Sequence, residues 1–369
     1  MSAAPSIAAG ANRAVRRVQT VTRRGATDLV AAVYAQAARE FAVVPPIAIH
    51  SPVPEILAGM WSLTREAFIV GRPGRARREM VAGVSQTNRC PYCVEVHSAM
   101  LHATRDHDLA RKLSSDAGAE EAAQAEPLIR WALSTRDPQA PALAHPPFSP
   151  AEAPQILGTA AAFHFINRMV SIFLEESPVP APVWASILKP LMRRLIGATL
   201  GKRMTGVEAM PGLSLALLPD AALPEQFRWA EPDPAVAGAI ARMASAVERH
   251  GSASLPEAAV ETVRARMAAW TGEDLGLGRQ WLEDALAPLK SEKDRAAARL
   301  ALLAALAAYR VDDAAIVSFR KHFPKDRQLI AVAAWGSFEA VKRISEWIAG
   351  PPANSSKDNG TAIELEANR

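Results

Sequence analysis

Apolar residues recur at the spacing of an α-helix along most of this 369-residue chain. Between positions 28 and 41 they fall at every third or fourth residue, and Val44-Pro45-Pro46 then ends the pattern. No stretch of the sequence shows the strict alternation of a half-buried β-strand. Heavy alanine use, with only 3 Tyr and 10 Phe, also favours helices over strands. We therefore expect an all-α fold.

The chain is long enough for two domains, each with a core of its own. Prolines punctuate residues 176–233, which is typical of a connecting region, and one basic amphipathic helix is expected within it at 184–195. The expected layout is a disordered basic arm at 1–25, a first helical domain at 26–175, this connector at 176–233, a second helical domain at 234–349 and a disordered tail at 350–369.

The most apolar segment, residues 151–174, should form the central buried helix of the first domain. His164, Asn167 and Arg168 are polar residues within it, so each needs a partner. We expect them to anchor the helix through hydrogen bonds and ion pairs rather than to contact a substrate. Upstream, Pro127 should kink or break a helix predicted over 119–134.

The net charge of +4 is small for this length and indicates no general nucleic-acid partner. No run of 18 or more apolar residues occurs, so no membrane span is expected. Residues 1–25 hold five arginines and no acidic residue, but they lack the apolar core of a signal peptide. These observations predict a cytoplasmic protein.

The segment 88–97, Asn-Arg-Cys-Pro-Tyr-Cys-Val-Glu-Val-His, holds both cysteines of the chain. Asn88 is a good N-cap residue and Pro91 is tolerated in a first turn, so we expect a helix to begin here. Cys90, Cys93 and His97 would then share one helix face, with Cys93 and His97 as direct neighbours. An imidazole and a helix N-terminus both lower the pKa of a thiol, and the thiolate is the reactive form. The arrangement predicts a reversible dithiol centre.

Four other interpretations compete with a dithiol centre. The cysteines could form a structural disulfide, which is rare inside cells, or be inert core residues. They could hold zinc together with His97, but His50 or His102 would have to complete the ligand set. The Cys-Pro-Tyr-Cys pattern is also that of glutaredoxins, whose fold needs a β-strand just before the motif, where this chain has a helical pattern. We expect neither a metal nor a cofactor.

The segment 78–93 with His97, followed later by Phe163-His-Phe-Ile-Asn-Arg168, resembles the AhpD-like alkylhydroperoxidase / carboxymuconolactone decarboxylase family. The resemblance covers about residues 40–175 and implies an all-helical fold. It further implies that Cys93 attacks an organic hydroperoxide, that Cys90 resolves the sulfenic acid into a disulfide, and that His97 relays a proton. A protein or small-molecule dithiol would then restore the thiols. A zinc-binding or redox-sensing module, or a non-redox decarboxylase or isomerase, is the alternative.

Glu79 is a fourth candidate catalytic residue. The family usually has a glutamate where this chain has Arg78, and Glu79 lies one position further on. Glu79 would be a general base for the thiols, or alternatively an exposed carboxylate paired with Arg75 or Arg78.

Residues 299–320 overlay on residues 78–99 without a gap. Val311, Ala314 and Ser318 then stand where Cys90, Cys93 and His97 do, while the later Phe338, Lys342 and Arg343 overlay Phe163, Asn167 and Arg168. We therefore predict two tandem AhpD-like domains related by a pseudo-two-fold axis, the second a degenerate copy without the chemistry. The second copy would supply a contact that such domains otherwise make in a homo-oligomer, which stays an alternative.

Overall fold

The computed structural model describes residues 15–71, 74, 81, 83–103, 111–113, 115–177, 209–276 and 278–350, except for the side chains of residues 102, 103 and 116. Within these residues all regular structure is helical, and β pairing is limited to one isolated bridge between Val15 and Leu174. The predicted all-α fold is confirmed. Glu79, the basic helix expected at 184–195 and the tail at 351–369 lie outside the described residues.

The helices are, in chain order, α2 (Asp28–Glu40), α3 (Pro45–Ala48), α4 (Pro54–Thr64), the π-helix η1 (Arg65–Ile69), α6 (Val84–Thr87), α7 (Pro91–Ala103), α9 (Asp116–Ala125), α10 (Pro127–Ser134), α11 (Pro141–Ala144), α12 (Ala153–Phe173), the 3₁₀-helices η3 (Leu213–Leu217) and η4 (Glu225–Ala230), α14 (Pro234–Ser252), α15 (Glu257–Ala269), α16 (Gln280–Leu286), α17 (Glu292–Leu306), the 3₁₀-helix η5 (Ala308–Arg310), α18 (Asp313–Arg320) and α19 (Asp326–Ile348).

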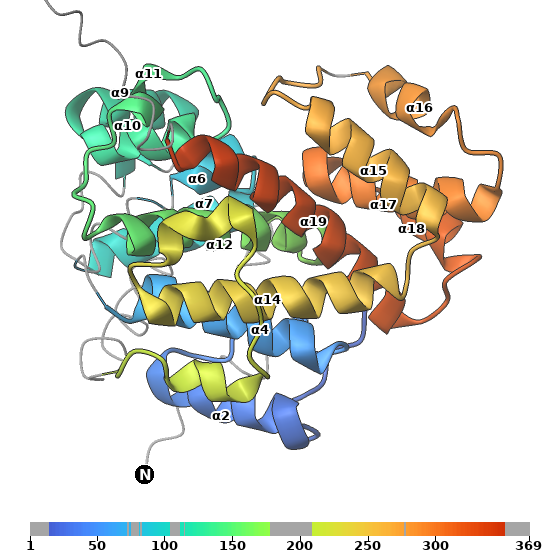
Figure 1. The fold of residues 1–369 in the computed structure, drawn as a ribbon, viewed down its shortest axis with the longest axis horizontal. Helices are drawn as coiled ribbons and strands as arrows, with labels where there is room; N and C mark the ends of the chain where they lie inside the picture. Colours follow the sequence, from blue (N-terminus) through green and yellow to red (C-terminus); the bar gives the residue numbers. More distant parts are fainter. Residues whose placement is uncertain are drawn as a thin grey trace, which may run out of the picture.

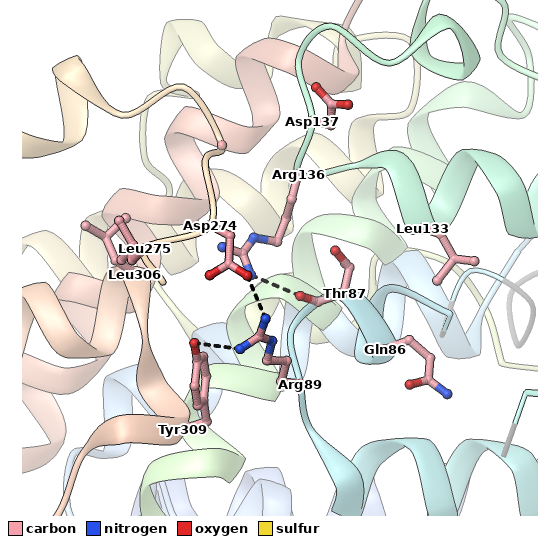
Figure 2. A pocket seen from close by; sticks show the side chains of 11 residues that line it. Gln86, Thr87, Arg89, Leu133, Arg136, Asp137, Asp274, Leu275, Leu306 and Tyr309 are labelled. Atoms are coloured by element: carbon pink, nitrogen blue, oxygen red, sulfur yellow. Dashed lines mark hydrogen bonds and ion pairs between the residues drawn. The ribbon is translucent and has the colours of Figure 1, made fainter. Parts of the chain in front are cut away.

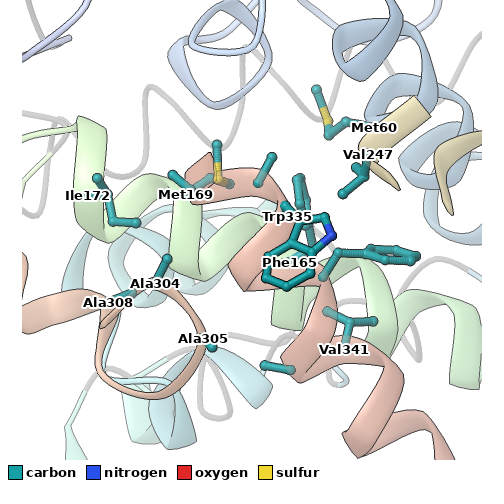
Figure 3. Close-up of a cluster of buried hydrophobic side chains, with 14 of the residues drawn as sticks. Met60, Phe165, Met169, Ile172, Val247, Ala304, Ala305, Ala308, Trp335 and Val341 are labelled. Atoms are coloured by element: carbon teal, nitrogen blue, oxygen red, sulfur yellow. The ribbon is translucent and has the colours of Figure 1, made fainter. Parts of the chain in front are cut away.

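Helix α12 lies at the centre of the molecule, where it packs against α19, and α4 packs against α14 (Figure 1). Figure 3 shows this core, in which Phe165 and Met169 of α12 meet Trp335 of α19 and Val247 of α14. One continuous buried cluster therefore runs through both halves of the chain, instead of a separate core in each. The packing of α12 on α19 is what a pseudo-two-fold axis would give, and the duplication itself stays a prediction.

Two close helix contacts depend on glycine. A Cβ atom on Gly59 of α4 would lie only 2.8 Å from Met243 Cα of α14, and one on Gly336 of α19 would collide with the carbonyl oxygen of Ala301 in α17. Backbone atoms cannot move aside as the end of a flexible side chain can. Glycine at position 59 therefore lets the two halves approach closely, and Gly336 does the same for α17 and α19 within the C-terminal half.

The N-terminal segment corrects one expectation. Residues 15–25, predicted to be part of a disordered arm, lie against the body of the protein: Arg16 N donates to Phe173 O at 2.9 Å, and Tyr34 Oη donates to Val21 O at 3.0 Å. Arg17 pairs with Asp313 at 2.9 Å. The prediction was based on the local excess of arginine. The contacts that order this segment involve residues far along the chain, namely the end of α12 and Asp313, which pairs with Arg17.

Two helix predictions can be compared directly with the structure. Pro127 breaks the helix predicted over 119–134, so that α9 ends at Ala125 and α10 begins at Pro127 itself. The central helix expected over 151–174 is α12. Among the described residues, α12 alone is long and apolar enough to cross a membrane, but 89% of its most apolar window is buried within the protein. Burial of that kind is characteristic of a core helix.

Candidate active site

The cysteine motif lies at the start of α7. Pro91 is its first residue, and the carbonyl oxygen of Cys90 accepts the first helical hydrogen bond, from Val94 N at 3.0 Å. Cys90 therefore occupies the N-cap position that the sequence assigned to Asn88. Asn88 instead ends the preceding helix, with its backbone N–H donating to Val84 O at 3.1 Å. The predicted cap is wrong because the side chain of Asn88 bonds inward to α12.

Cys90 and Cys93 are joined by a disulfide, with their Cα atoms 5.4 Å apart. Both side chains are buried, at 1% and 3% exposure. The bond closes a ring of four residues across the first turn of α7. This short loop at a helix N-terminus is a geometry in which the two sulfur atoms can pair and separate without rearranging the fold.

His97 follows Cys93 by one helical turn, at i+4 on α7. Its imidazole is half-buried and packs edge-on against Phe163 of α12, with ring centroids 4.6 Å apart, and against Phe68 of η1 at 5.9 Å. Two helices outside the motif thus hold the ring in place beside the helix face that carries Cys93. The structure places Cys93 and His97 on α7, with Cys90 at its N-cap.

The side chain of Asn88 ties the loop before the cysteines to the central helix. Its Nδ2 lies 3.0 Å from His164 Nδ1 and donates to Asn167 Oδ1, also at 3.0 Å. Asn167 in turn donates to Ser85 Oγ at 3.1 Å. His164 and Asn167 on α12 therefore hold Asn88 and the end of α6 in place, which is the anchoring role expected for them.

The protonation of His164 follows from its neighbours. Thr135 Oγ1 donates its proton to Ala132 O at 2.8 Å, so its oxygen accepts from His164 Nε2, 2.9 Å away. His164 Nδ1 is then an acceptor for Asn88. Burial lowers the pKa of His164 well below its usual value, and the charges of Arg168 and Arg136 lower it further. The ring is neutral, with its proton on Nε2.

Arg168 departs from the expected ion pair. Its guanidinium donates to Ala305 O at 2.8 Å, to His164 O at 2.6 Å and to Asn88 Oδ1 at 3.2 Å, and no carboxylate among the described residues pairs with it. Burial lowers the pKa of Arg168, as does the nearby charge of Arg136. Carbonyl dipoles thus replace a counter-ion, and Arg168 connects the cysteine loop to the end of α17.

Arg89, directly before Cys90, was not singled out by the sequence reasoning. Its φ of 52° lies in the left-handed region, which few residues other than glycine adopt. The guanidinium donates to Asp274 Oδ2 at 2.7 Å and to Tyr309 Oη at 3.1 Å, and it lies over the Tyr309 ring (Figure 2). Both partners belong to the C-terminal half. The only sequence signal for this role is adjacency to the first cysteine.

A cavity of about 240 Å³ opens onto Cys90. Its other walls include Arg89, Tyr92 and Tyr309, whereas Cys93 does not line it. Burial raises the pKa of the Tyr92 phenol, and the charge of Glu95 raises it further, so this wall stays uncharged. Of the two cysteines, Cys90 is the one that lines this cavity.

The histidine suggested as a zinc ligand lies elsewhere. His50 is fully buried and stacks on Phe165, with centroids 5.6 Å apart, and burial lowers its pKa to about 4. The side chain of His102 lies outside what the structure describes. Among the residues that are described, no three His, Cys, Asp or Glu side chains come together as a metal site would require.

Almost the full length of the chain is similar to one known protein. It is 34% identical, over 350 residues, to "Alkyl hydroperoxide reductase Rv2159c" of Mycobacterium tuberculosis (strain ATCC 25618 / H37Rv), an alignment that covers 94% of this chain and 99% of that protein. No protein-family model and no solved structure matches the chain. Identity at this level along almost the full length of both proteins, with a Cys-x-x-Cys pair at the start of a helix, shows that the chain belongs to the AhpD-like alkyl hydroperoxide reductase family.

Proposed function

We propose that this protein is a thiol-dependent peroxidase that reduces organic hydroperoxides through Cys90 and Cys93. The observation that carries the proposal is the disulfide between these cysteines at the N-terminus of α7, with His97 one turn beyond Cys93. A disulfide here is the state that such an enzyme would reach after a hydroperoxide has oxidised its two thiols. The name of the mycobacterial relative supports the same reaction class.

In the oxidative half of the reaction, the thiolate of Cys93 attacks the distal oxygen of the hydroperoxide. The O–O bond breaks, Cys93 becomes a sulfenic acid, and the alkoxide leaves as an alcohol after it gains a proton. His97 is the group one turn away that would take the thiol proton and return it to the alkoxide. The thiolate of Cys90 then attacks the sulfenic sulfur, which forms the disulfide and releases water.

In the reductive half, an external dithiol returns two electrons. One thiolate of the reductant attacks one sulfur of the disulfide and forms a mixed disulfide with the protein. The second thiol of the reductant then attacks this mixed disulfide and releases the protein cysteine. We take Cys90 as the target because this residue lines the 240 Å³ cavity, whereas Cys93 does not. Attack at Cys90 releases Cys93 as the thiolate, ready for the next peroxide. The reductant would be a protein or small-molecule dithiol, and a cytoplasmic location stays a prediction.

Turnover of an organic hydroperoxide tests this proposal. The purified protein should consume tert-butyl hydroperoxide in the presence of dithiothreitol. Cys93→Ser should lose turnover because it lacks the attacking thiolate, and Cys90→Ser should be slowed because dithiothreitol must then reduce the Cys93 sulfenic acid directly. Ser318→Ala is the matched control, because Ser318 is the position that overlays His97 in the C-terminal half. Turnover that survives in both cysteine variants would overturn the proposal.

A further inference from the structure

A second cavity lies between the two halves of the chain, and it shares Arg89 and Tyr309 as lining residues with the one that opens onto Cys90. It measures about 340 Å³, a volume suited to a small organic molecule. Figure 2 shows its lining: Thr87, Arg89 and Arg136 come from the N-terminal half, and Asp274 and Tyr309 from the C-terminal half. Nothing in the peroxidase proposal uses it.

Among the residues that the structure describes, the guanidinium of Arg136 in this cavity makes no ion pair. Its Nη1 donates to Thr87 O at 3.0 Å, and its flat face lies over the Trp270 ring, 5.5 Å from the centroid. Its Nε is buried and has no hydrogen-bond acceptor. Among the described residues, no carboxylate pairs with Arg136 and no acceptor bonds its Nη2. A buried donor without an acceptor is costly, and a ligand that satisfies it recovers that cost.

The carboxylates around the cavity are engaged elsewhere. Asp274 accepts from Arg89 through Oδ2 and from Gly276 N through Oδ1, at 2.7 and 3.1 Å. Glu273 pairs with Arg266 at 2.8 Å. Asp137 is exposed and accepts from the backbone of Gln139. Arg136 therefore has no direct ion pair among the described residues, and it feels only the longer-range attraction of Asp274 and Glu273.

We propose that this cavity binds a small organic anion, a carboxylate or a phosphate monoester, through the Nε and Nη2 edge of Arg136. The carbonyl of Thr87 occupies the other side of the guanidinium, so this edge is the one left for a ligand. It presents two parallel N–H donors, which is the geometry that a carboxylate or phosphate accepts in a bidentate pair. Trp270 beneath the guanidinium fixes its plane. Arg89 also lines the cavity, where its own charge is paired with Asp274.

Isothermal titration of the full-length protein with three probes of similar size tests the site. Benzoate and benzamide have nearly the same shape but differ in charge, and phenyl phosphate presents the second anion class. Benzoate should bind at least about tenfold more tightly than benzamide, since an Arg–carboxylate pair is a charge-assisted bond that the amide cannot form. Phenyl phosphate binding more tightly than benzoate would assign the site to phosphate monoesters, and the reverse order to carboxylates.

Substitutions assign the binding to Arg136. Arg136→Gln should weaken benzoate to the level of benzamide, whereas Arg130→Gln, an exposed arginine on α10 that bonds only to Ala123 O, should leave both affinities unchanged. If Arg136→Gln unfolds at the assay temperature, Arg136→Lys decides: it keeps the charge but loses the two-donor edge, and it should still weaken benzoate several-fold. Benzoate that binds no better than benzamide, or equally well to the folded Arg136 variant, would overturn the proposal. Neither outcome depends on peroxidase activity.

Discussion

Arg89 Nη2 lies 2.7 Å from Asp274 Oδ2, so the residue directly before the first cysteine is held by the C-terminal half of the chain. Tyr309 gives the same guanidinium a second contact, at 3.1 Å. Both members of the ion pair are at least half exposed, and pairs of this kind contribute about 0–1 kcal/mol to stability. The contacts of Arg89 instead restrain its backbone, which is in the left-handed conformation one residue before Cys90.

Asp274→Ala should therefore slow disulfide formation with little loss of stability. Without Asp274, Arg89 and the backbone it holds are less restrained, and Cys90 meets the sulfenic sulfur less often in the right geometry. We expect closure of the disulfide to slow about threefold or more, measured by rapid quench and alkylation after peroxide is added to the reduced protein. Asp313→Ala is the control, because it breaks the Arg17–Asp313 pair between the same halves. Equal rates in the two variants would contradict a positioning role.

His97→Ala should lower hydroperoxide turnover by about 10²-fold, the usual size of a general acid–base contribution. The ring lies one turn from Cys93 and is held by Phe163 and Phe68, so its position is fixed before substrate arrives. Steady-state kinetics with dithiothreitol as reductant measure the effect. Glu79→Gln should cost less, and if it proves as damaging as His97→Ala, the family glutamate has kept its role despite the one-residue offset.

His50 should make the fold sensitive to acid. Its folded-state pKa is about 4, against about 6.5 in the unfolded chain, so the unfolded state binds more protons between these values. Stability from this residue is complete above pH 6.5 and falls by roughly 3 kcal/mol as the pH drops to 4. His164, whose pKa is lowered in the same direction, adds to the loss.

Urea unfolding of the wild type and of His50→Leu at pH 7 and pH 4.5 checks this account. Leucine cannot take up a proton, so the variant should lose less stability between the two pH values than the wild type does. An equal loss in both proteins would show that the burial of His50 does not couple folding to protonation.

Gly336→Ala should destabilise the protein by about 1–3 kcal/mol, the usual cost of overpacking a core. The new Cβ would meet the carbonyl of Ala301, and α17 and α19 would have to separate. Gly278→Ala is the matched control, since nothing lies within 4 Å of a Cβ there, and it should stay within about 0.5 kcal/mol of the wild type. Urea midpoints measure both changes, and similar values for the two variants would mean that α19 does not need close contact at Gly336.

The parts of the fold that the sequence predicted are those set by local chemistry. Helical period and alanine content determine the all-α class, and a proline ends one helix and begins the next at Pro127. The spacing of Cys93 and His97 places them on one helix once Pro91 starts it, with Cys90 at its N-cap. These features depend on residues within a few positions of one another, which a sequence displays directly.

The remaining features depend on pairs that are distant in sequence. Asp274 is 185 positions from Arg89, and Asp313 is 296 positions from Arg17, so neither pair could be inferred from local pattern. Asn88 has the side chain of a good N-cap, but the demand of buried His164 and Asn167 for partners outweighs that local preference. Arg168 was expected to find a carboxylate. It bonds instead to His164 O of its own helix and to Ala305 O, which comes within reach only once α12 and α17 have packed.

The central claim is that Cys93 attacks the peroxide and Cys90 resolves the product. Intact-mass spectrometry of the reduced Cys90→Ser and Cys93→Ser variants, after one equivalent of organic hydroperoxide and a sulfenic-acid trap, tests it most directly. The account predicts one trapped sulfenic acid in Cys90→Ser, located at Cys93, and none in Cys93→Ser. A trapped sulfenic acid in Cys93→Ser, with none in Cys90→Ser, would contradict it and reverse the two roles.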